Sequence, residues 1–345
     1  MTRKTHGEII VNLWFIRHSN GLFHYGLDYA EALGDAVGAI WVRDEVLAAA
    51  VRKRLPQACV RQLTPRALFL ALGRVAKGAA LLFTPSSHPI AFVRRQVVVV
   101  HDSYPFTGRV GRIKLALFRT ALAVSGATAG YINHADARAF LRQCGLLASR
   151  TRFLPNRIGV TGPRSKASSG RRAAEPETTV IGLFGSDSPK KNYDALFAAA
   201  MAAQPVTRQI EWRIFGHANA YTDRLQRDHP TLAIKVIESD RMTMEAFVDD
   251  LDIAVSIAAG EGFARPVALA LMRGVPTLLL DTPVFREFYA GSAALFDTPE
   301  ALVAAIPENL DDSKQPRFAR ADELRADFAN GVAWLRQQAF PGELA

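Results

Sequence analysis

The sequence predicts an α/β protein made of two Rossmann-like domains, each built on a parallel sheet. Two observations carry this prediction. Apolar runs of strand length alternate with helical patterns along the chain, and one polar segment interrupts the alternation near its middle. The length of 345 residues suits two domains of about 150 residues each. In a pair of facing domains of this kind, the ligand is expected in the central cleft, at the carboxyl ends of the strands.

The N-terminal half opens with an apolar run at residues 9–16, which predicts a strand. A turn at Ser19, Asn20 and Gly21 follows, and a helix with apolar spacings of three and four then runs to Leu33. The four consecutive valines at 97–100 are typical of a parallel strand buried on both faces. Further strands are predicted at residues 39–42, 81–84, 96–101, 129–132 and 152–154, and helices from residue 44 and over 135–144.

Residues 161–178 contain almost nothing apolar beyond alanine, which predicts a linker. A second alternating series follows it. Its strands are predicted at residues 180–184, 211–215, 234–237, 253–257 and 277–280, and its helices at 192–203, 244–250 and 267–273. We therefore expect an N-terminal domain over 1–160, a linker over 161–178 and a C-terminal domain over 179–320. A last helix within 321–345 is expected to pack back toward the N-terminal domain.

The charge is distributed unevenly along the chain. Residues 1–172 contain 26 Lys and Arg against 8 Asp and Glu, whereas residues 173–345 contain 16 against 25. A basic half of this kind predicts an anionic partner, and nucleic acid, an acidic membrane or a phosphorylated substrate all qualify. Segments 66–77 and 109–123 interleave basic with apolar residues. Each is either an interfacial membrane anchor or an ordinary helix packed on a sheet with a solvated face.

The sequence argues against disulfide-rich, zinc-binding, secreted and membrane-spanning proteins. Two cysteines, Cys59 and Cys144, fit neither a disulfide framework nor a zinc site, which favours a reducing compartment. The apolar run at 9–16 leads into Arg17 and His18, unlike a signal peptide, and no uncharged apolar stretch approaches the roughly 20 residues of a membrane span. We expect a cytoplasmic protein, peripheral at the cytoplasmic membrane face at most. No convincing Asp-x-Asp metal motif is found, and we expect no metal and no cofactor.

Residues 259–276 (AGEGFARPVALALMRGVP) combine a loop with the start of a helix. Glu261 stands at the turn, and Gly262 and Ala264 allow a ligand to approach the backbone. Pro266 favours a helix start there, because its missing N–H costs nothing in the first turn. A helix N-terminus attracts anions, and a carboxylate beside it accepts hydrogen bonds from sugar hydroxyls. The alternative, a generic loop-to-helix junction with a solvated glutamate, stays open on this pattern alone.

The string E-G-F-x-x-P-x-x-x-A-x-x-x-G-x-P at residues 261–276 resembles the signature loop of the retaining GT-B glycosyltransferases of family 4. The resemblance implies the GT-B fold, with an N-terminal acceptor domain and a C-terminal domain that binds a nucleoside-diphosphate sugar. Glu261 would then position the donor sugar, and the backbone of Gly262, Phe263, Ala264 and Arg265 would face the diphosphate.

The resemblance extends more loosely over nearly the whole chain. The turn at 184–192 is similar to the family's diphosphate-binding turn, which implies roles for Ser186 and Lys191. Glu287 matches an acidic residue near the end of the domain. In the N-terminal half, Gly21 matches the donor-facing glycine loop. His101, at the end of the valine strand, matches a histidine that contacts the transferred sugar or the acceptor, although a hydrogen-bonded strand-end histidine remains an alternative. His88 is a weaker acceptor-side candidate.

Two positions depart from the family pattern. The second glutamate of the loop, which binds the nucleotide ribose, is Leu269 here, and the arginine of the diphosphate turn is Ser186. Both changes remove polar ligands of the nucleotide. Arg265 is one compensating cation close to the phosphates. The departures therefore leave open an unusual donor or a loss of activity.

The resemblance implies retaining glycosyl transfer to a glycan or lipid-linked acceptor in polysaccharide or glycolipid synthesis. Three rivals stay open: a catalytically degenerate scaffold or partner subunit, a GT-B sugar epimerase, and a nucleic-acid binder. The acidic C-terminal half and the lack of a recognisable binding motif argue against nucleic acid.

Overall fold

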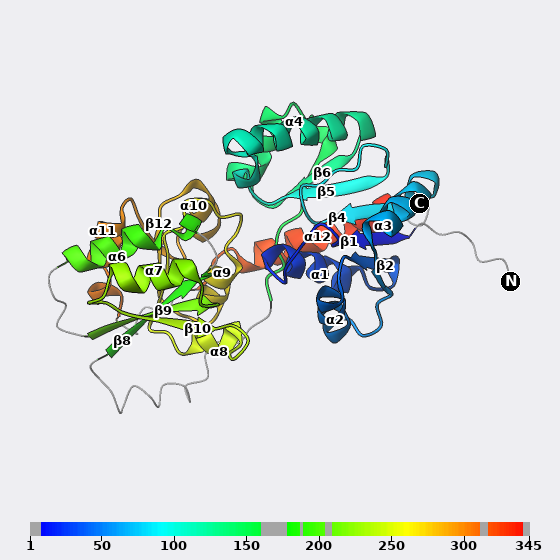
Figure 1. The fold of residues 1–345 in the computed structure, drawn as a ribbon. Coiled ribbons are helices and arrows are strands. Elements are labelled where there is room, and N and C mark those ends of the chain that lie inside the picture. The colour runs from blue at the N-terminus through cyan, green and yellow to red at the C-terminus, as the bar shows by residue number, and fades with distance from the viewer. Residues whose placement is uncertain (1–7, 160–177, 187–188, 204–208, 311–316, 341–345) are drawn as a thin grey trace. The chain divides into compact units, whose positions relative to one another are not determined.

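The computed structural model describes residues 8–159, 178–186, 189–203, 209–310 and 317–340. The chain forms two compact units (Figure 1). Unit 1 consists of residues 1–157 and 322–345, and unit 2 of residues 158–321. Of the predicted linker over 161–178, only Thr178 is described, where it begins a strand. No helix among the described residues is both long enough and apolar enough to cross a membrane.

Unit 1 is a seven-stranded parallel sheet in the order β3-β2-β1-β4-β5-β6-β7. Its strands are β1 (Ile9–Asn12), β2 (Val37–Val42), β3 (Val60–Gln62), β4 (Leu81–Thr84), β5 (Gln96–Val100), β6 (Thr128–Tyr131) and β7 (Thr151–Phe153). Its helices are α1 (Gly21–Leu33), α2 (Glu45–Arg54), α3 (Pro65–Lys77), α4 (Gly108–Ser125), α5 (Ala139–Gln143) and, from residue 322 on, α12 (Ala321–Ala339). The predicted valine strand is β5, and all five of its residues are buried.

Helices cover both faces of this sheet: α4 lies on one side, and α1 and α2 lie on the other (Figure 1). The register places α3 on the side of α4. Leu82 pairs with Gln96, and Val98 lies two residues further along β5, so Leu82 and Val98 point to the same face. Leu82 packs in the cluster that contains the buried residues of α3, and Val98 in the cluster that contains those of α4.

The first strand is shorter than predicted. The predicted strand covers residues 9–16, whereas β1 ends at Asn12 and residues 14–15 form a turn. The buried Asn12 side chain accepts a bond from the Trp14 amide (3.3 Å) and donates to Thr84 Oγ1 (3.2 Å). A local bond of this kind turns the backbone away from the ladder, which explains why apolar content alone overestimates the strand.

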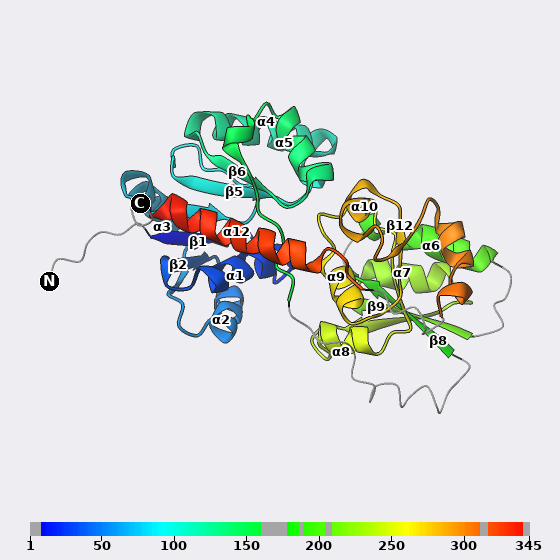
Figure 2. The same cartoon turned by 180° about the vertical axis from the view of Figure 1, so that it is seen from behind.

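Helix α12 packs against α1 (Figure 2). The rings of Tyr29 and Phe328 lie 4.6 Å apart, and Arg336 Nη2 donates to the carbonyls of Ala32 (3.2 Å) and Leu33 (2.9 Å). Tyr29 is fully buried, and its hydroxyl donates to the Pro155 carbonyl at 3.0 Å. Burial raises the pKa of this phenol, so it remains a neutral donor.

Unit 2 is a six-stranded parallel sheet in the order β10-β9-β8-β11-β12-β13. Its strands are β8 (Thr178–Phe184), β9 (Gln209–Gly216), β10 (Ala233–Glu238), β11 (Ile253–Ser256), β12 (Thr277–Leu280) and β13 (Ala294–Phe296). Its helices are α6 (Tyr193–Ala202), α7 (Ala220–Asp228), α8 (Met244–Asp249), α9 (Arg265–Met272), α10 (Pro283–Tyr289) and α11 (Pro299–Ala304).

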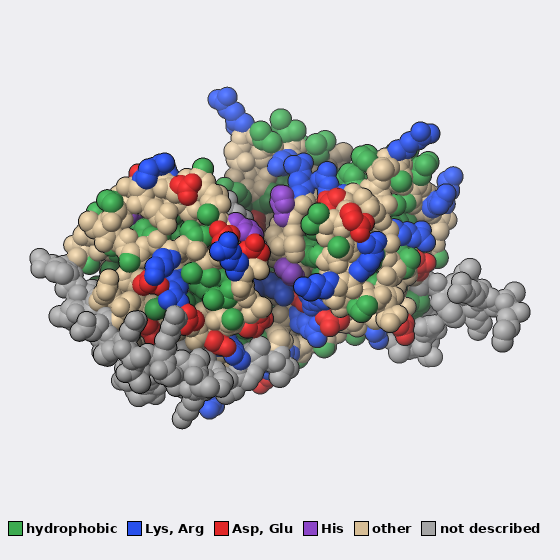
Figure 3. Space-filling view, turned by 60° about the horizontal axis from the view of Figure 1, so that its bottom comes forward, with side chains coloured by type: hydrophobic (Ala, Val, Ile, Leu, Met, Phe, Trp, Pro, Cys, Tyr) green, Lys and Arg blue, Asp and Glu red, His purple; other side chains and the backbone are tan. Residues whose placement is uncertain are grey.

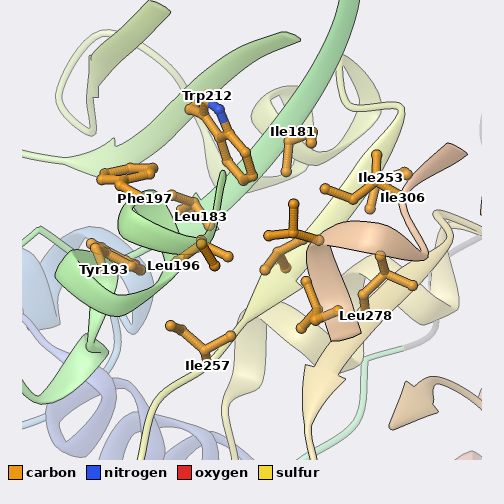
Figure 4. Packing of buried hydrophobic residues seen from close by; sticks show 14 of the residues in the cluster. Ile181, Leu183, Tyr193, Leu196, Phe197, Trp212, Ile253, Ile257, Leu278 and Ile306 are labelled. Atoms are coloured by element: carbon orange, nitrogen blue, oxygen red, sulfur yellow. The ribbon is translucent and has the colours of Figure 1, made fainter. Parts of the chain in front are cut away.

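The main core cluster of unit 2 is built on the central strands of its sheet (Figure 4). Trp212 of β9 is 1% exposed, and its ring meets Phe197 of α6 edge-on at 5.6 Å. Ile181, Ile253 and Leu278, from three neighbouring strands, are fully buried in the same cluster. Both units are thus Rossmann-like α/β layers on parallel sheets, which confirms the predicted fold class.

Candidate functional site

The chemically active side chains of unit 2 gather after the carboxyl ends of its strands. In a parallel sheet these ends share one edge, which is the usual ligand-binding edge of a Rossmann-like domain. Ser186 follows β8, His217 follows β9, and Glu261 lies five residues after the end of β11. The site is therefore built by loops on a rigid sheet.

Lys191 and Glu261 form the central contact of this edge. Lys191 ends a 3-10 turn, Pro189–Lys191, that precedes α6, and its Nζ lies 2.5 Å from Glu261 Oε1. Their side chains are only 16% and 13% exposed. An ion pair this sheltered is less screened by solvent than a surface pair, and it joins two loops that are 70 residues apart in the sequence.

The backbone on either side of this ion pair is unusual. Asn192 (φ 61°) and Ala264 (φ 58°) are the two non-glycine residues with positive φ in the described part of the chain. Asn192 follows Lys191 directly, and Ala264 lies three residues after Glu261. A left-handed alanine costs about 1 kcal/mol or more, so the surrounding contacts must hold the loop in this form.

Tyr289 of α10 supplies those contacts. Its hydroxyl donates to the carbonyl of Phe263 and lies 3.2 Å from that of Ala264. The Phe263 side chain is 3% exposed and meets the Phe288 ring edge-on at 4.8 Å. Phe263 therefore anchors the loop by its ring and offers a ligand only its backbone. Burial raises the pKa of the Tyr289 phenol well above its usual value, and the charge of Glu261 adds to the rise.

The loop leads into α9, which begins at Arg265 and has Pro266 in its first turn, close to the predicted start. Ala264 is the N-cap residue and makes no side-chain capping bond. A helix leaves the N–H groups of its first turn without intrahelical partners and carries a partial positive charge there. Gly262 is buried, and Arg265 is half-buried. The N–H groups and the partial positive charge at the start of α9 therefore suit the binding of an anion.

Ser186 has a structural role in this edge. It is 4% exposed, and its Oγ accepts a bond from the His217 amide at 2.8 Å. A Cβ atom added at Gly216 would lie 2.2 Å from this Oγ, so the loops after β8 and β9 are packed tightly together. The small Ser186 side chain thus joins two loops.

Two other predicted ligand residues lie on nearby helices. Leu269 is half-buried on α9 and brings no polar group to the edge. Glu287 is half-buried on α10, two residues before Tyr289, and its backbone carbonyl accepts a bond from Arg320 Nη1 at 2.5 Å.

The predicted residues of the N-terminal half lie in unit 1. His101 follows β5, its Nε2 lies 3.2 Å from the Pro85 carbonyl, and the Tyr25 ring meets it edge-on at 4.6 Å. Gly21 is exposed and begins α1, where Asn20 caps the first turn; a Cβ atom at Gly21 would meet nothing within 4 Å. His88 is bonded to Ser86 Oγ at 3.1 Å through its Nδ1 and stacks on Phe15 with ring centroids 4.7 Å apart.

The sequence reasoning missed three features of unit 2. The role of Tyr289 leaves no signal in the sequence, because an aromatic residue at a helix end is typical of an ordinary core position. The left-handed backbone of Asn192 leaves no signal there either. The third feature is a cluster of His217, Glu238 and Asp240, whose ligand atoms lie within 4.8 Å of one another. His217 already contacts Glu238 (3.0 Å) and Ser239 Oγ (3.0 Å), and the Ala218 amide lowers the pKa of Glu238. These bonds explain the cluster without a cation.

Comparison with protein-family models and with curated protein sequences gives no match. Among solved structures, the chain is similar to HepE of Anabaena in complex with UDP and glucose, with a TM-score of 0.73 and 16% identity over 97% of this chain and 96% of that one. It is also similar to WaaG, a glycosyltransferase involved in lipopolysaccharide biosynthesis, with a TM-score of 0.67 and 14% identity over 97% and 100%.

A glycosyltransferase from Rickettsia africae gives a TM-score of 0.68 and 11% identity over 98% of this chain and 95% of that one. These likenesses extend over almost the full length of each chain, although the identities are low. The neighbours are GT-B glycosyltransferases, and the chain shares with them two Rossmann-like domains on parallel sheets. This chain therefore has the GT-B fold.

Proposed function

We propose that this protein is a glycosyltransferase that moves a sugar from a nucleoside-diphosphate sugar, with retention, to a glycan or lipid-linked acceptor. The observation that carries the proposal is the sheltered Lys191–Glu261 pair beside the left-handed loop at the start of α9. It combines a cation, a carboxylate and a helix N-terminus at one strand edge. Those groups suit a diphosphate next to sugar hydroxyls.

In the proposed reaction, negative charge develops on the diphosphate as the bond to the sugar breaks. Lys191 and the backbone N–H groups at the start of α9 would stabilise that charge, and groups placed where charge develops usually contribute most to catalysis. Glu261 would turn from Lys191 to the hydroxyls of the donor sugar. We propose that His101 contacts the sugar or the acceptor.

UDP is the first nucleotide to test, because HepE is in complex with UDP and glucose and a TarM variant is in complex with UDP. Isothermal titration with UDP, GDP and ADP should identify the base, and release of the nucleotide from matching sugar donors should measure turnover. NMR of the product's anomeric centre tests retention. Lys191→Ala should weaken nucleotide binding tenfold or more, since a charge-assisted contact contributes about 1.5–3 kcal/mol.

Lys235→Ala is the matched control, because Lys235 is a lysine of the same unit that is 60% exposed on β10 and pairs with Glu211 of β9, outside the loops of the candidate site. Unchanged turnover in both Lys191→Ala and Glu261→Ala would refute the assignment.

A catalytically degenerate GT-B scaffold is the second candidate, and two observations favour it. Ser186 is occupied in joining loops, and Leu269 offers no bond to a ribose. No binding of any nucleotide or nucleotide sugar by the wild-type chain would support the scaffold over the enzyme.

The proposed setting is polysaccharide or glycolipid synthesis in the cytoplasm, at the cytoplasmic membrane face. The excess of basic residues in the N-terminal half supports contact with an anionic membrane surface.

A further inference from the structure

Helix α4 of unit 1 has two apolar faces, although only one of them packs on the sheet. Its buried residues Gly111, Phe118, Leu122 and Ser125 face the sheet, and two of them belong to a core cluster. Four further apolar side chains are about two-thirds exposed to solvent. They are Val110 (65% exposed), Ile113 (64%), Leu117 (67%) and Val124 (66%).

These four residues follow one another at spacings of three, four and seven, so they form one continuous line along the helix. We name this line the α4 stripe. At 3.6 residues per turn, Arg112 and Arg119 lie on one flank of the stripe, and Lys114 lies on the other. All three are exposed, and α4 contains no acidic residue. An apolar line with cations on both sides is therefore presented outward.

Helix α3 adds to the same side of the sheet. Phe69 and Leu70 are 67% and 57% exposed, and Phe92, in the loop before β5, is 48% exposed. The rings of Phe69 and Phe92 lie 6.0 Å apart. Because α3 and α4 cover one face of the sheet, their outward faces are turned the same way.

The charge around these elements has one sign. From the start of α3 to the end of α4, residues 65–125, the sequence contains nine Lys and Arg and one acidic residue, Asp102. Figure 3 views unit 1 from the opposite side, that of α1 and α2, where acidic side chains lie among the basic ones. A contact between two copies of the face that carries α3 and α4 would bring cations against cations, which disfavours self-association.

We propose that the α4 stripe, with Phe69, Leu70 and Phe92, inserts into the interface of an anionic lipid bilayer. The exposed apolar side chains enter the boundary between headgroups and acyl chains, and the flanking cations contact anionic headgroups. Helix α4 has 18 residues but is not apolar enough to cross a membrane, so in this proposal it lies in the plane of the membrane. This inference is independent of the donor-site proposal, because it rests on residues of unit 1 alone.

Sedimentation of the full chain with vesicles tests the proposal. We expect binding to vesicles of phosphatidylcholine with one-third phosphatidylglycerol, and little binding to phosphatidylcholine alone. The double variant Ile113→Ser/Leu117→Ser should lower the partition coefficient tenfold or more, since two exposed apolar side chains no longer leave water. Arg112→Gln/Arg119→Gln should lower it by about fivefold for each charge removed.

Val46→Ser is the matched control, because Val46 is 79% exposed on α2, on the opposite face of the sheet, and should leave the partition coefficient unchanged. Circular dichroism checks folding, and titration with UDP checks unit 2 separately. Absence of vesicle binding overturns the proposal, and so does binding that the serine variant does not weaken. Concentration-dependent association of the wild-type chain that the serine variant abolishes would instead assign the stripe to a second copy.

Discussion

Lys191 and Glu261 are held 2.5 Å apart by two loops of unit 2, and both side chains are largely sheltered from water. Two residues with opposite charges thus occupy the edge where a diphosphate and a sugar are proposed to bind. Any anion that reaches Lys191 must compete with the carboxylate of Glu261. Substitution of Lys191 should therefore lower the affinity for the nucleotide, whereas substitution of Glu261 should raise it.

Glu261→Gln should separate binding of the nucleotide from catalysis. Without the carboxylate, Lys191 is no longer neutralised, so the affinity for UDP should rise by about threefold to tenfold, equal to roughly 1 kcal/mol. Turnover of the matching sugar donor should fall by about 100-fold, because the carboxylate that we propose to position the sugar is lost. Isothermal titration and an assay of UDP release measure the two effects.

Glu308→Gln is the control for the general loss of a negative charge in unit 2, since Glu308 is exposed outside the site. A loss of UDP affinity in Glu261→Gln, together with unchanged affinity in the control, would mean that Glu261 supports the nucleotide instead of competing with it.

Tyr289→Phe tests the support of the loop. The change leaves the ring in place but removes the bonds to the carbonyls of Phe263 and Ala264. We expect a loss of about 1–2 kcal/mol in the free energy of unfolding and a higher KM for the donor, because the loop is no longer fixed. Tyr29→Phe loses a comparable buried bond in unit 1. It should cost similar stability and leave the UDP affinity unchanged; equal losses of affinity in both variants would contradict the local role of Tyr289.

Ala264 tests the backbone strain directly. Glycine at this left-handed position removes a cost of about 1 kcal/mol but adds a similar entropy cost, so Ala264→Gly should change the free energy of unfolding by less than about 0.5 kcal/mol. Ala198→Gly, at an exposed position within α6, should lose about 1 kcal/mol. Urea denaturation compares the two, and equal losses would argue against strain at Ala264. Ala264→Val should be the least stable of the three.

Periodicity and apolar runs were sufficient to predict the alternating elements and the parallel sheet of each unit. The strands and helices around Val97 and Val180 were found because their apolar runs have no polar interruption. The sequence did not predict where a side chain would turn the backbone, as Asn12 does at the end of β1. It also missed short elements with little apolar content, such as β3 and α7.

The resemblance named the candidate site residues, but it gave only part of their geometry. It singled out Glu261 in the loop at 261–276 and Lys191 in the turn at 184–192, and the structure brings these two into contact. It gave no sign that Phe263 is a buried anchor or that Ser186 joins two loops, because both depend on partners distant in the sequence. A contact of this type is fixed by tertiary packing, which a local pattern does not contain.

His88 makes the stability of the chain depend on pH in a defined direction. His88 is exposed by surface area, but partial loss of solvation among its neighbours lowers the pKa of its imidazole below the usual 6.5, and the charge of Lys114 adds to this effect. The unfolded chain therefore binds a proton at His88 more readily than the folded chain does. The contribution of His88 to the free energy of unfolding is thus fully present above pH 6.5 and is lost as the pH falls through the folded-state pKa.

In His88→Gln, which keeps a polar side chain near Ser86, the melting temperature should fall less between pH 6.5 and pH 5 than in the wild type. Thermal unfolding followed by circular dichroism at steps of half a pH unit measures both slopes. Parallel curves would show that the His88 imidazole titrates alike in the folded and unfolded chain, contrary to the loss of solvation expected for a ring stacked on Phe15.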